Sequence, residues 1–193
     1  MSGKSEKKAE VPPPEGLVYG MEFISIEEEN ELVEQFKELP FKEFLYQGYR
    51  AKRRVLTFGY AYDFTTNEFS KTTPIPDFLL PFRDRAAAFA SMPPGKLKEA
   101  LLTEYTPGTP IGWHRDLPMF DTILGISLSS SCIMRFKPYK KEGDVFSIEL
   151  EPRSIYIMKG KARWSYQHSI PPVKSLRYSI TFRSFRSDID KDL

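Results

Sequence analysis

Short runs rich in β-branched and aromatic residues, separated by turn-forming segments, fill the second half of the sequence and limit the fold more than any other feature. The runs are EALLTEYTPG, TILGISLS, CIMRFKP, FSIELEP, SIYIMKG and LRYSITFRSF. Segments such as TPGTP, KPYKKEGD and IPPVKS lie between them, and their glycine, proline and aspartate residues favour turns. Strands that recur about every ten residues with turns between them are typical of antiparallel sandwiches, barrels and jelly rolls.

Two helices are expected ahead of these strands. The segment SIEEENELVEQFKEL begins with Ser25 and Glu28 at the spacing of a capping box. Apolar residues recur at three-residue intervals between residues 33 and 39, which predicts one buried helical face, and Pro40 ends the helix. A second helix is expected over residues 76–90. The overall prediction is an α+β fold in which N-terminal helices back a C-terminal antiparallel β-sandwich.

The length and composition predict one domain. A chain of 193 residues that is 40% hydrophobic can bury a substantial core. We expect the domain to span residues 17–187, with a disordered polar tail over residues 1–16 and a short tail over residues 188–193. The single cysteine, Cys132, lies among apolar residues, so we expect a buried side chain. One cysteine also suits a reducing compartment, and we expect the cytoplasm, or the nucleus in a eukaryotic cell.

The pattern of apolar residues predicts neither a membrane span nor a signal peptide. No run of about 18 apolar residues is present, so no membrane span is expected. The N-terminal segment MSGKSEKKAEVPPPEG lacks the apolar core of a signal peptide. The net charge of +2 is only mildly basic, so it permits an anionic partner without requiring one.

The segment GWHRD carries the first candidate site residues. Residues i and i+2 of a strand point to the same face, so His114 and Asp116 can aim at one point while Arg115 points away. The only other histidine is His168. Two histidines and one carboxylate can occupy one face of an octahedral iron(II) ion and leave the other positions open. Zinc accepts the same ligands with tetrahedral geometry, and ordinary surface and core histidines are the alternative to a metal site.

The last predicted strand, RYSITFR, places four polar residues on one face. These residues are Arg177, Ser179, Thr181 and Arg183. The two arginines lie about 20 Å apart along the strand, so only their long side chains could flank a small diacid between them. Arginine offers bidentate hydrogen bonds to a carboxylate. This face therefore lines a polar cleft or, alternatively, faces solvent.

Aromatic and basic residues alternate ahead of the second helix. The aromatic residues are Tyr46, Tyr49, Phe58, Tyr60 and Tyr62, and the basic ones are Arg50, Lys52, Arg53 and Arg54. This composition is typical of a nucleic-acid groove. The alternative is a hairpin whose aromatic face packs on the core. Elsewhere, we expect both tryptophans, Trp113 and Trp164, in the core. We expect Lys137, Lys140 and Lys141 in a solvated turn, and contact with phosphates is the alternative for these lysines.

Taken together, several segments resemble the AlkB family of Fe(II)- and 2-oxoglutarate-dependent dioxygenases. They are TEYTPGTPIGWHRD, TILGISLS, YQHSIPP, RYSITFR and, ahead of the second helix, FGYAYDF. The resemblance covers about residues 17–185 in order. It implies a double-stranded β-helix, a jelly roll with the metal between its two sheets.

The resemblance also implies a role for each candidate residue. His114, Asp116 and His168 would bind the iron. Arg177 and Tyr105 would hold the distal carboxylate of 2-oxoglutarate, and Arg183 would serve the end near the metal.

Two positions depart from the family pattern or extend it. Thr103 stands where the family usually has asparagine, and its shorter side chain can still hydrogen-bond to the co-substrate. Tyr60 and Tyr62 fall where the family has the tyrosines of a lid over the active site, and Arg54 lies upstream of them, so these three are the candidate substrate-binding residues. The segment after Asp116 lacks the acidic residue that several repair enzymes carry, so the substrate cannot be carried over from them.

The function that the resemblance implies is oxidative removal of alkyl groups from nucleic-acid bases. The expected partner is DNA or RNA that carries an alkylated base and is single-stranded or has the base flipped out. We expect a monomer. The alternative is an AlkB-like oxygenase that acts on a protein or a small molecule. A binding module without turnover is a third class, and the complete set of histidines, aspartate and arginines speaks against it.

Overall fold

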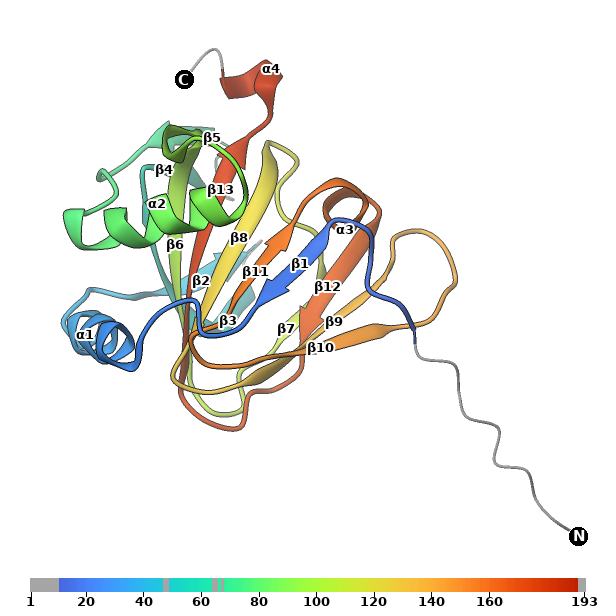
Figure 1. Ribbon diagram of the computed structural model, residues 1–193, viewed down its shortest axis with the longest axis horizontal. Coiled ribbons are helices and arrows are strands. Elements are labelled where there is room, and N and C mark those ends of the chain that lie inside the picture. The colour runs from blue at the N-terminus through green and yellow to red at the C-terminus, as the bar shows by residue number, and fades with distance from the viewer. Residues whose placement is uncertain (1–10, 47–48, 64–65, 67, 191–193) are drawn as a thin grey trace, which may run out of the picture.

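The computed structural model describes residues 11–46, 49–63, 66 and 68–190. Two antiparallel sheets face each other and a separate hairpin lies at one end (Figure 1). The 7-stranded sheet has the order β1-β11-β8-β13-β6-β3-β2, the 4-stranded sheet has the order β10-β9-β12-β7, and β4 pairs with β5. This arrangement confirms the predicted α+β fold with an antiparallel sandwich.

The strands of the large sheet are β1 (Leu17–Gly20), β2 (Lys42–Tyr46), β3 (Tyr49–Phe58), β6 (Leu97–Tyr105), β8 (Phe120–Leu128), β11 (Ile155–Met158) and β13 (Arg177–Phe185). Those of the small sheet are β7 (Ile111–His114), β9 (Cys132–Pro138), β10 (Phe146–Leu150) and β12 (Tyr166–Ile170). The hairpin consists of β4 (Tyr60–Asp63) and β5 (Glu68–Lys71). Every β-rich run of the second half is therefore a strand.

The two predicted helices are present. Helix α1 spans Ile26–Lys37, and the Ser25 hydroxyl and the Glu28 carboxylate form the capping box that the sequence indicates. Helix α2 spans Leu80–Phe89 after a 3₁₀ turn, η1, at Asp77–Leu79. A second 3₁₀ turn, η2 (Pro94–Lys96), and two short helices, α3 (Gly160–Trp164) and α4 (Ser187–Asp190), were not predicted.

The two faces of the large sheet differ in chemistry because side chains alternate along each strand. Leu102, Ile126 and Ile180 belong to the face that packs with α1 and α2 in one apolar core. The other face carries the polar row of β13 from Arg177 to Arg183, and this row is buried toward the small sheet. The alternative that these arginines face solvent is therefore wrong, and the face lines a polar interior.

Described residues at both ends of the chain contact the rest of the fold. Residues 1–10 and 191–193 lie outside the described residues. The backbone carbonyls of Glu15 and Gly16, however, accept hydrogen bonds from Ala162 and Lys159, which fixes the chain before β1. At the other end, Asp190 pairs with Lys96, which ends η2, and with Lys98 of β6, so these ion pairs tie α4 to the large sheet. Composition alone could not show these contacts, because they depend on tertiary neighbours.

Cys132 is buried, as predicted. Among the residues that the structure describes, no helix has the length and apolar character to cross a membrane.

Candidate metal centre

His114 and His168 are directly opposite each other on the neighbouring strands β7 and β12. Opposite residues of an antiparallel pair point to the same face, and the two imidazole centroids are 4.2 Å apart. Asp116 lies just beyond the end of β7. Ligand atoms of the three side chains all lie within 4.8 Å of one another, so the three could hold one metal ion. The structure therefore brings together the residues that the sequence singled out.

Arg163, on α3, holds the segment that carries Asp116. Its Nη2 donates to the carbonyl oxygens of Asp116, Leu117 and Phe120 at 3.3, 2.8 and 3.0 Å. The strand geometry assumed from the sequence does not apply to Asp116, because β7 ends at His114. A buried guanidinium, rather than a ladder of strand hydrogen bonds, fixes the backbone there. Sequence reasoning missed this residue.

Arg183 determines which oxygen of Asp116 remains available. Its Nε and Nη2 donate to Asp116 Oδ1 at 3.2 and 2.8 Å. Its Nη1 donates to both carboxylate oxygens of Glu99 at 2.9 and 3.0 Å. Asp116 Oδ2 instead lies 3.5 Å from His168 Nε2. The carboxylate can therefore offer Oδ2 to a metal while Oδ1 stays with the arginine.

The hydrogen bonds and charges around the three residues suit a metal. His114 Nδ1 lies 2.9 Å from the carbonyl oxygen of Gly112, which can only accept, so Nδ1 donates there and Nε2 is the ring nitrogen left for a metal. Burial, and then the nearby His114, lower the pKa of His168 to about 3, which keeps its ring neutral. Burial opposes the ionisation of Asp116, but Arg183 and the two histidines outweigh it and hold the pKa below its usual range. Two imidazoles and one carboxylate form the donor set that non-haem iron(II) prefers.

Arg177 forms the second part of the site. Its side chain lies against the Tyr105 ring, with the guanidinium carbon 4.7 Å from the ring centroid, and its Nε donates to Ser127 Oγ at 3.2 Å. The residue is only 1% exposed, yet its Nη1 has no hydrogen-bond partner among the described residues. A buried cationic donor without a partner is costly, so an anionic ligand is expected there. A carboxylate of 2-oxoglutarate fits this position.

The remaining co-substrate candidates share this buried face. Tyr105 lies opposite Arg177, and Thr103 lies opposite Ser179, in the pairing of β6 with β13. The hydroxyl oxygens of Tyr105 and Ser179 are 3.5 Å apart. The predicted co-substrate roles of Thr103, Tyr105, Arg177 and Arg183 stay predictions. The donors of Arg183 are directed at the carboxylates of Asp116 and Glu99.

The candidate substrate residues are less well placed. Tyr60 is buried and stacks on Phe69 with centroids 5.2 Å apart, and Tyr62 lies opposite Phe69 in the β4–β5 hairpin. Phe58 belongs to the apolar core. The side chains of Tyr46, Tyr49 and Arg50 lie outside the described residues. The alternative of a hairpin that packs its aromatic residues on the core therefore applies to Tyr60 and Phe69.

Arg54 points to the wrong face for a substrate contact. It donates from Nε and Nη2 to the two Glu104 oxygens, both at 2.7 Å, and the Tyr178 hydroxyl donates to the same carboxylate. Its neighbour in β3, Val55, lies opposite Thr103, so the alternation of the strand turns Arg54 away from the cleft. The prediction that Arg54 binds substrate is corrected: it neutralises the buried carboxylate of Glu104.

Replacing Arg54 with methionine should therefore lower stability and leave ligand affinity unchanged. The change leaves the buried Glu104 carboxylate with only the Tyr178 hydroxyl, which we expect to cost about 1–3 kcal/mol of unfolding free energy. Urea unfolding measures this loss, and Lys52→Met, at an exposed position of the same strand, is the matched control. A loss of oligonucleotide affinity with unchanged stability would restore the substrate-binding role.

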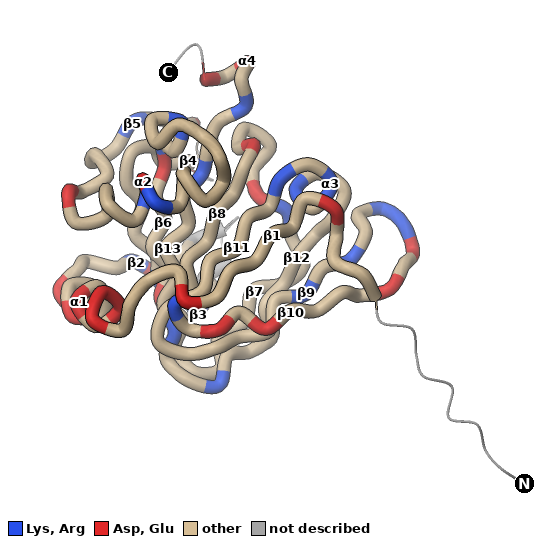
Figure 2. The backbone as a smooth tube through the Cα atoms, in the orientation of Figure 1, with Lys and Arg blue, Asp and Glu red and all other residues tan. Residues whose placement is uncertain are grey.

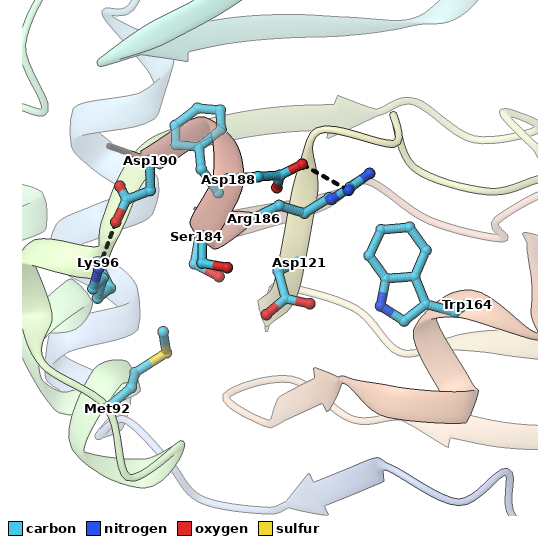
Figure 3. Close-up of a pocket in the computed structure, with 10 residues that line it drawn as sticks. Met92, Lys96, Asp121, Trp164, Ser184, Arg186, Asp188 and Asp190 are labelled. Atoms are coloured by element: carbon cyan, nitrogen blue, oxygen red, sulfur yellow. Dashed lines mark hydrogen bonds and ion pairs between the residues drawn. The ribbon is translucent and has the colours of Figure 1, made fainter. Parts of the chain in front are cut away.

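The tryptophans are not core residues. Trp113 is partly exposed on the outer face of the small sheet, with Lys137 Nζ 4.5 Å and the Arg135 guanidinium 5.0 Å from its ring. Trp164 is partly exposed and lines a pocket of about 780 Å³ together with Lys96, Asp121 and Ser184, among others (Figure 3). The pocket includes none of the three candidate metal ligands. The large apolar area of a tryptophan side chain is therefore not sufficient to predict that the side chain is buried.

Comparisons with known proteins agree with this geometry. The family model described as the 2OG-Fe(II) oxygenase superfamily matches residues 16–183. The chain is 29% identical over 174 residues to the "Alkylated DNA repair protein ALKBH8 homolog" of Arabidopsis thaliana, covering 71% of this chain and 50% of the relative. It is 31% identical over 170 residues to the "tRNA (carboxymethyluridine(34)-5-O)-methyltransferase ALKBH8" of Mus musculus, covering 83% of this chain and 25% of the relative. The chain thus spans half or less of these relatives.

Two further similarities concern the enzyme class and the fold. The chain is 36% identical over 92 residues to the "Alpha-ketoglutarate-dependent dioxygenase alkB homolog 7, mitochondrial" of Bos taurus, covering 46% of this chain and 40% of the relative. The solved structure of OsALKBH1 superposes with a TM-score of 0.71 at 16% identity, over 91% of this chain and 99% of that chain. This likeness confirms the predicted jelly roll.

Proposed function

The chain belongs to the 2OG-Fe(II) oxygenase superfamily, in its AlkB-like branch, and from this premise we propose that it oxidatively removes alkyl groups from nucleic-acid bases. It is an oxygenase that uses Fe(II) and 2-oxoglutarate. The observation that carries the proposal is the convergence of His114, Asp116 and His168 in a polar cleft. The cleft also holds the Arg177 donor that has no partner among the described residues. The printed names of two relatives, which refer to alkylated DNA and to tRNA, support a nucleic-acid substrate.

We assign the metal to His114 Nε2, His168 and Asp116 Oδ2, and the distal carboxylate of 2-oxoglutarate to Arg177 and Tyr105. When bound, the iron and 2-oxoglutarate supply the oxidation of a C–H bond with dioxygen. The protein positions these groups. Arg163 fixes the backbone around Asp116. Arg183 donates hydrogen bonds to Asp116 Oδ1, so Oδ2 remains available to the metal.

A basic and aromatic surface adjoins the site and supports a nucleic-acid partner. Trp113 and Arg115, on either side of His114 in the sequence, both take part in cation–π contacts: Trp113 with Arg135 and Lys137, and Arg115 with Tyr139 at 3.6 Å. Figure 2 shows basic positions along β9 and both signs of charge in the loop that follows it. Exposed aromatic rings beside cations can stack bases and attract phosphates. β7 is the edge strand of the small sheet. This one strand therefore separates the surface on its outer face from the cleft on its inner face.

A protein or small-molecule substrate is the second candidate. The observation that favours it is the position of Arg54 and Tyr60, two of the three predicted substrate residues, because Arg54 pairs with Glu104 and Tyr60 stacks on Phe69. The mild net charge of +2 agrees with this candidate as well.

An activity assay against a panel of alkylated oligonucleotides separates the two candidates. We expect loss of the alkyl group, read by mass spectrometry, with succinate formed in step, on at least one alkylated single strand. Asp116→Ala protein is the control. Succinate production that no modified oligonucleotide stimulates would contradict the proposal and favour the second candidate.

Replacing Lys137 with glutamate should weaken oligonucleotide binding in a salt-dependent way. Loss of one phosphate contact on single-stranded nucleic acid lowers the slope of log affinity against log salt by about 0.7. Fluorescence anisotropy at several salt concentrations measures the slope. Lys37→Glu makes the same charge change on α1, beside Glu34, and should leave the slope unchanged. Equal slopes for the two variants would exclude the outer face of the small sheet as the nucleic-acid surface.

A further inference from the structure

Tyr156 lies across the floor of the cleft, and it is not among the residues that the sequence analysis singled out. It belongs to β11, where it is opposite Gly125 of β8. Gly125 is in turn opposite Thr181, which lies between Arg177 and Arg183 on β13. The three residues form one row across the sheet, on the face that carries the polar side chains.

The tyrosine ring extends along this row, over Gly125. A Cβ atom built on Gly125 would lie 2.3 Å from Cε1 and Cζ of Tyr156 and 2.5 Å from its hydroxyl oxygen. These distances are far below van der Waals contact, so only glycine leaves room for the ring. The hydroxyl end of Tyr156 therefore reaches past its own strand toward β13.

The surroundings of the hydroxyl are those of an anion site. Tyr156 is 9% exposed, and no described residue hydrogen-bonds to its hydroxyl. Burial, followed by the neighbouring Tyr105 and Asp116, raises the pKa of Tyr156, while Arg177 and Arg183 act in the opposite direction. The phenol therefore stays protonated and can donate a hydrogen bond. A phenol hydroxyl that has no hydrogen-bond partner among the described residues can donate to an anionic ligand in the cleft.

We infer that the Tyr156 hydroxyl is a third donor to the carboxylate of 2-oxoglutarate that Arg177 and Tyr105 bind. The inference rests on the proposed assignment of that carboxylate to Arg177. Tyr105 is the neighbour that raises the pKa of Tyr156 most after burial, and it packs directly on Arg177. The three donors then come from β6, β11 and β13, and Gly125 is the position that lets the one from β11 reach the others.

The test is the affinity of Tyr156→Phe protein for two ligands that differ only in the distal carboxylate. Calorimetric titration without oxygen, with Mn(II) in place of iron, measures binding of 2-oxoglutarate and of 2-oxopentanoate. Loss of a hydrogen bond to a charged group should weaken 2-oxoglutarate binding at least about tenfold. Binding of 2-oxopentanoate should stay within about twofold of the wild-type value, because it lacks the group that Tyr156 contacts.

The controls separate this inference from the proposed function. Tyr19→Phe removes a hydroxyl from the neighbouring position of the same sheet, where it accepts a hydrogen bond from the Glu151 backbone, and should bind both ligands normally. If Arg177→Met loses 2-oxoglutarate binding while Tyr156→Phe keeps it, the inference is wrong and the proposed site stands. If Arg177→Met keeps it, the proposed site itself is wrong. Equal weakening of both ligands by Tyr156→Phe would mean a purely structural role and would also overturn the inference.

A second variant tests the role of Gly125. Gly125→Ala should weaken 2-oxoglutarate binding at least as much as Tyr156→Phe, because the new methyl group displaces the ring. In a Tyr156→Leu background the same change should have little further effect, since the hydroxyl is already absent. Additive losses in the double variant would contradict the packing of Tyr156 on Gly125.

Discussion

An Arg177→Met variant should lose 2-oxoglutarate binding and yet be at least as stable as the wild-type protein. The guanidinium is fully buried, and one of its nitrogens has no partner in the part of the chain that the structure describes, so without a ligand it contributes a desolvation cost that few protein contacts offset. Replacing a poorly paired buried charge with an apolar side chain of similar length is often neutral or stabilising. Removal of a charge-assisted contact to the co-substrate should raise the concentration needed for half-maximal turnover at least about a hundredfold.

The stability of Arg177→Met should be unchanged or higher while its affinity for 2-oxoglutarate falls, and this combination makes the prediction specific. Thermal unfolding measures the stability, and calorimetric titration with Mn(II) present measures the affinity for 2-oxoglutarate. A lysine at position 177 is the second variant, because it keeps the charge but loses the bidentate geometry. A large loss of stability in Arg177→Met would mean that the arginine is a structural element of the core rather than the receptor of an anion.

An Asp116→Ala variant should reduce turnover at least about a thousandfold, as removal of an essential catalytic group commonly does. The change removes the one anionic member of the metal-binding set and frees Arg183 from its second carboxylate. The pKa of Asp116 is depressed in the folded protein, so its ionic pairing stabilises the fold at neutral pH and is lost only as pH falls through that depressed value. The variant should therefore melt at a lower temperature near neutral pH, with a transition that remains cooperative.

Equilibrium binding of Fe(II) without oxygen is the direct measurement for this variant. Asp121→Ala is the matched control, because Asp121 is an exposed aspartate five residues further along the chain. Iron affinity and turnover should be normal in the control and lost in Asp116→Ala. Retention of full activity by Asp116→Ala with added iron would show that the metal binds elsewhere.

Local patterns in the sequence were sufficient for most of the fold. The capping box before α1 and the β-rich runs that became β6, β8, β9 and β13 are each determined by neighbouring residues. The histidines and aspartate could also be singled out, because the chain has only two histidines and one of them belongs to an H-x-D motif. Their convergence could not be derived in this way, because it depends on the pairing of β12 with β7, which places His168 opposite His114.

The wrong predictions for Arg54 and Trp113 have a common physical cause, which is that each assigns a strand residue to the wrong face of its sheet. The basic and aromatic composition predicts a substrate role for Arg54, but a strand exposes alternate residues on opposite sides, and a shift of one position decides between the cleft and Glu104. The size of Trp113 predicts a core position, but the residue lies on the outer face of a sheet whose inner face carries His114. Composition does not distinguish the two faces of a strand.

The positioning residues had weaker signals. Glu99 and Arg163 act through contacts 84 and 43–47 residues away in the sequence, so no local pattern marks them. Tyr156 did have an indirect signal, which is the glycine inside the strand TILGISLS. A glycine within a strand often marks the close approach of another group, and here that group is the tyrosine ring.

A crystal structure with Mn(II) and 2-oxoglutarate, grown without oxygen, tests the central claim most directly. The account predicts a metal bound by His114 Nε2, His168 and Asp116 Oδ2, and a distal carboxylate on Arg177 Nη1. A metal that leaves His168 unbound, or a co-substrate whose distal carboxylate lies away from Arg177, would contradict it.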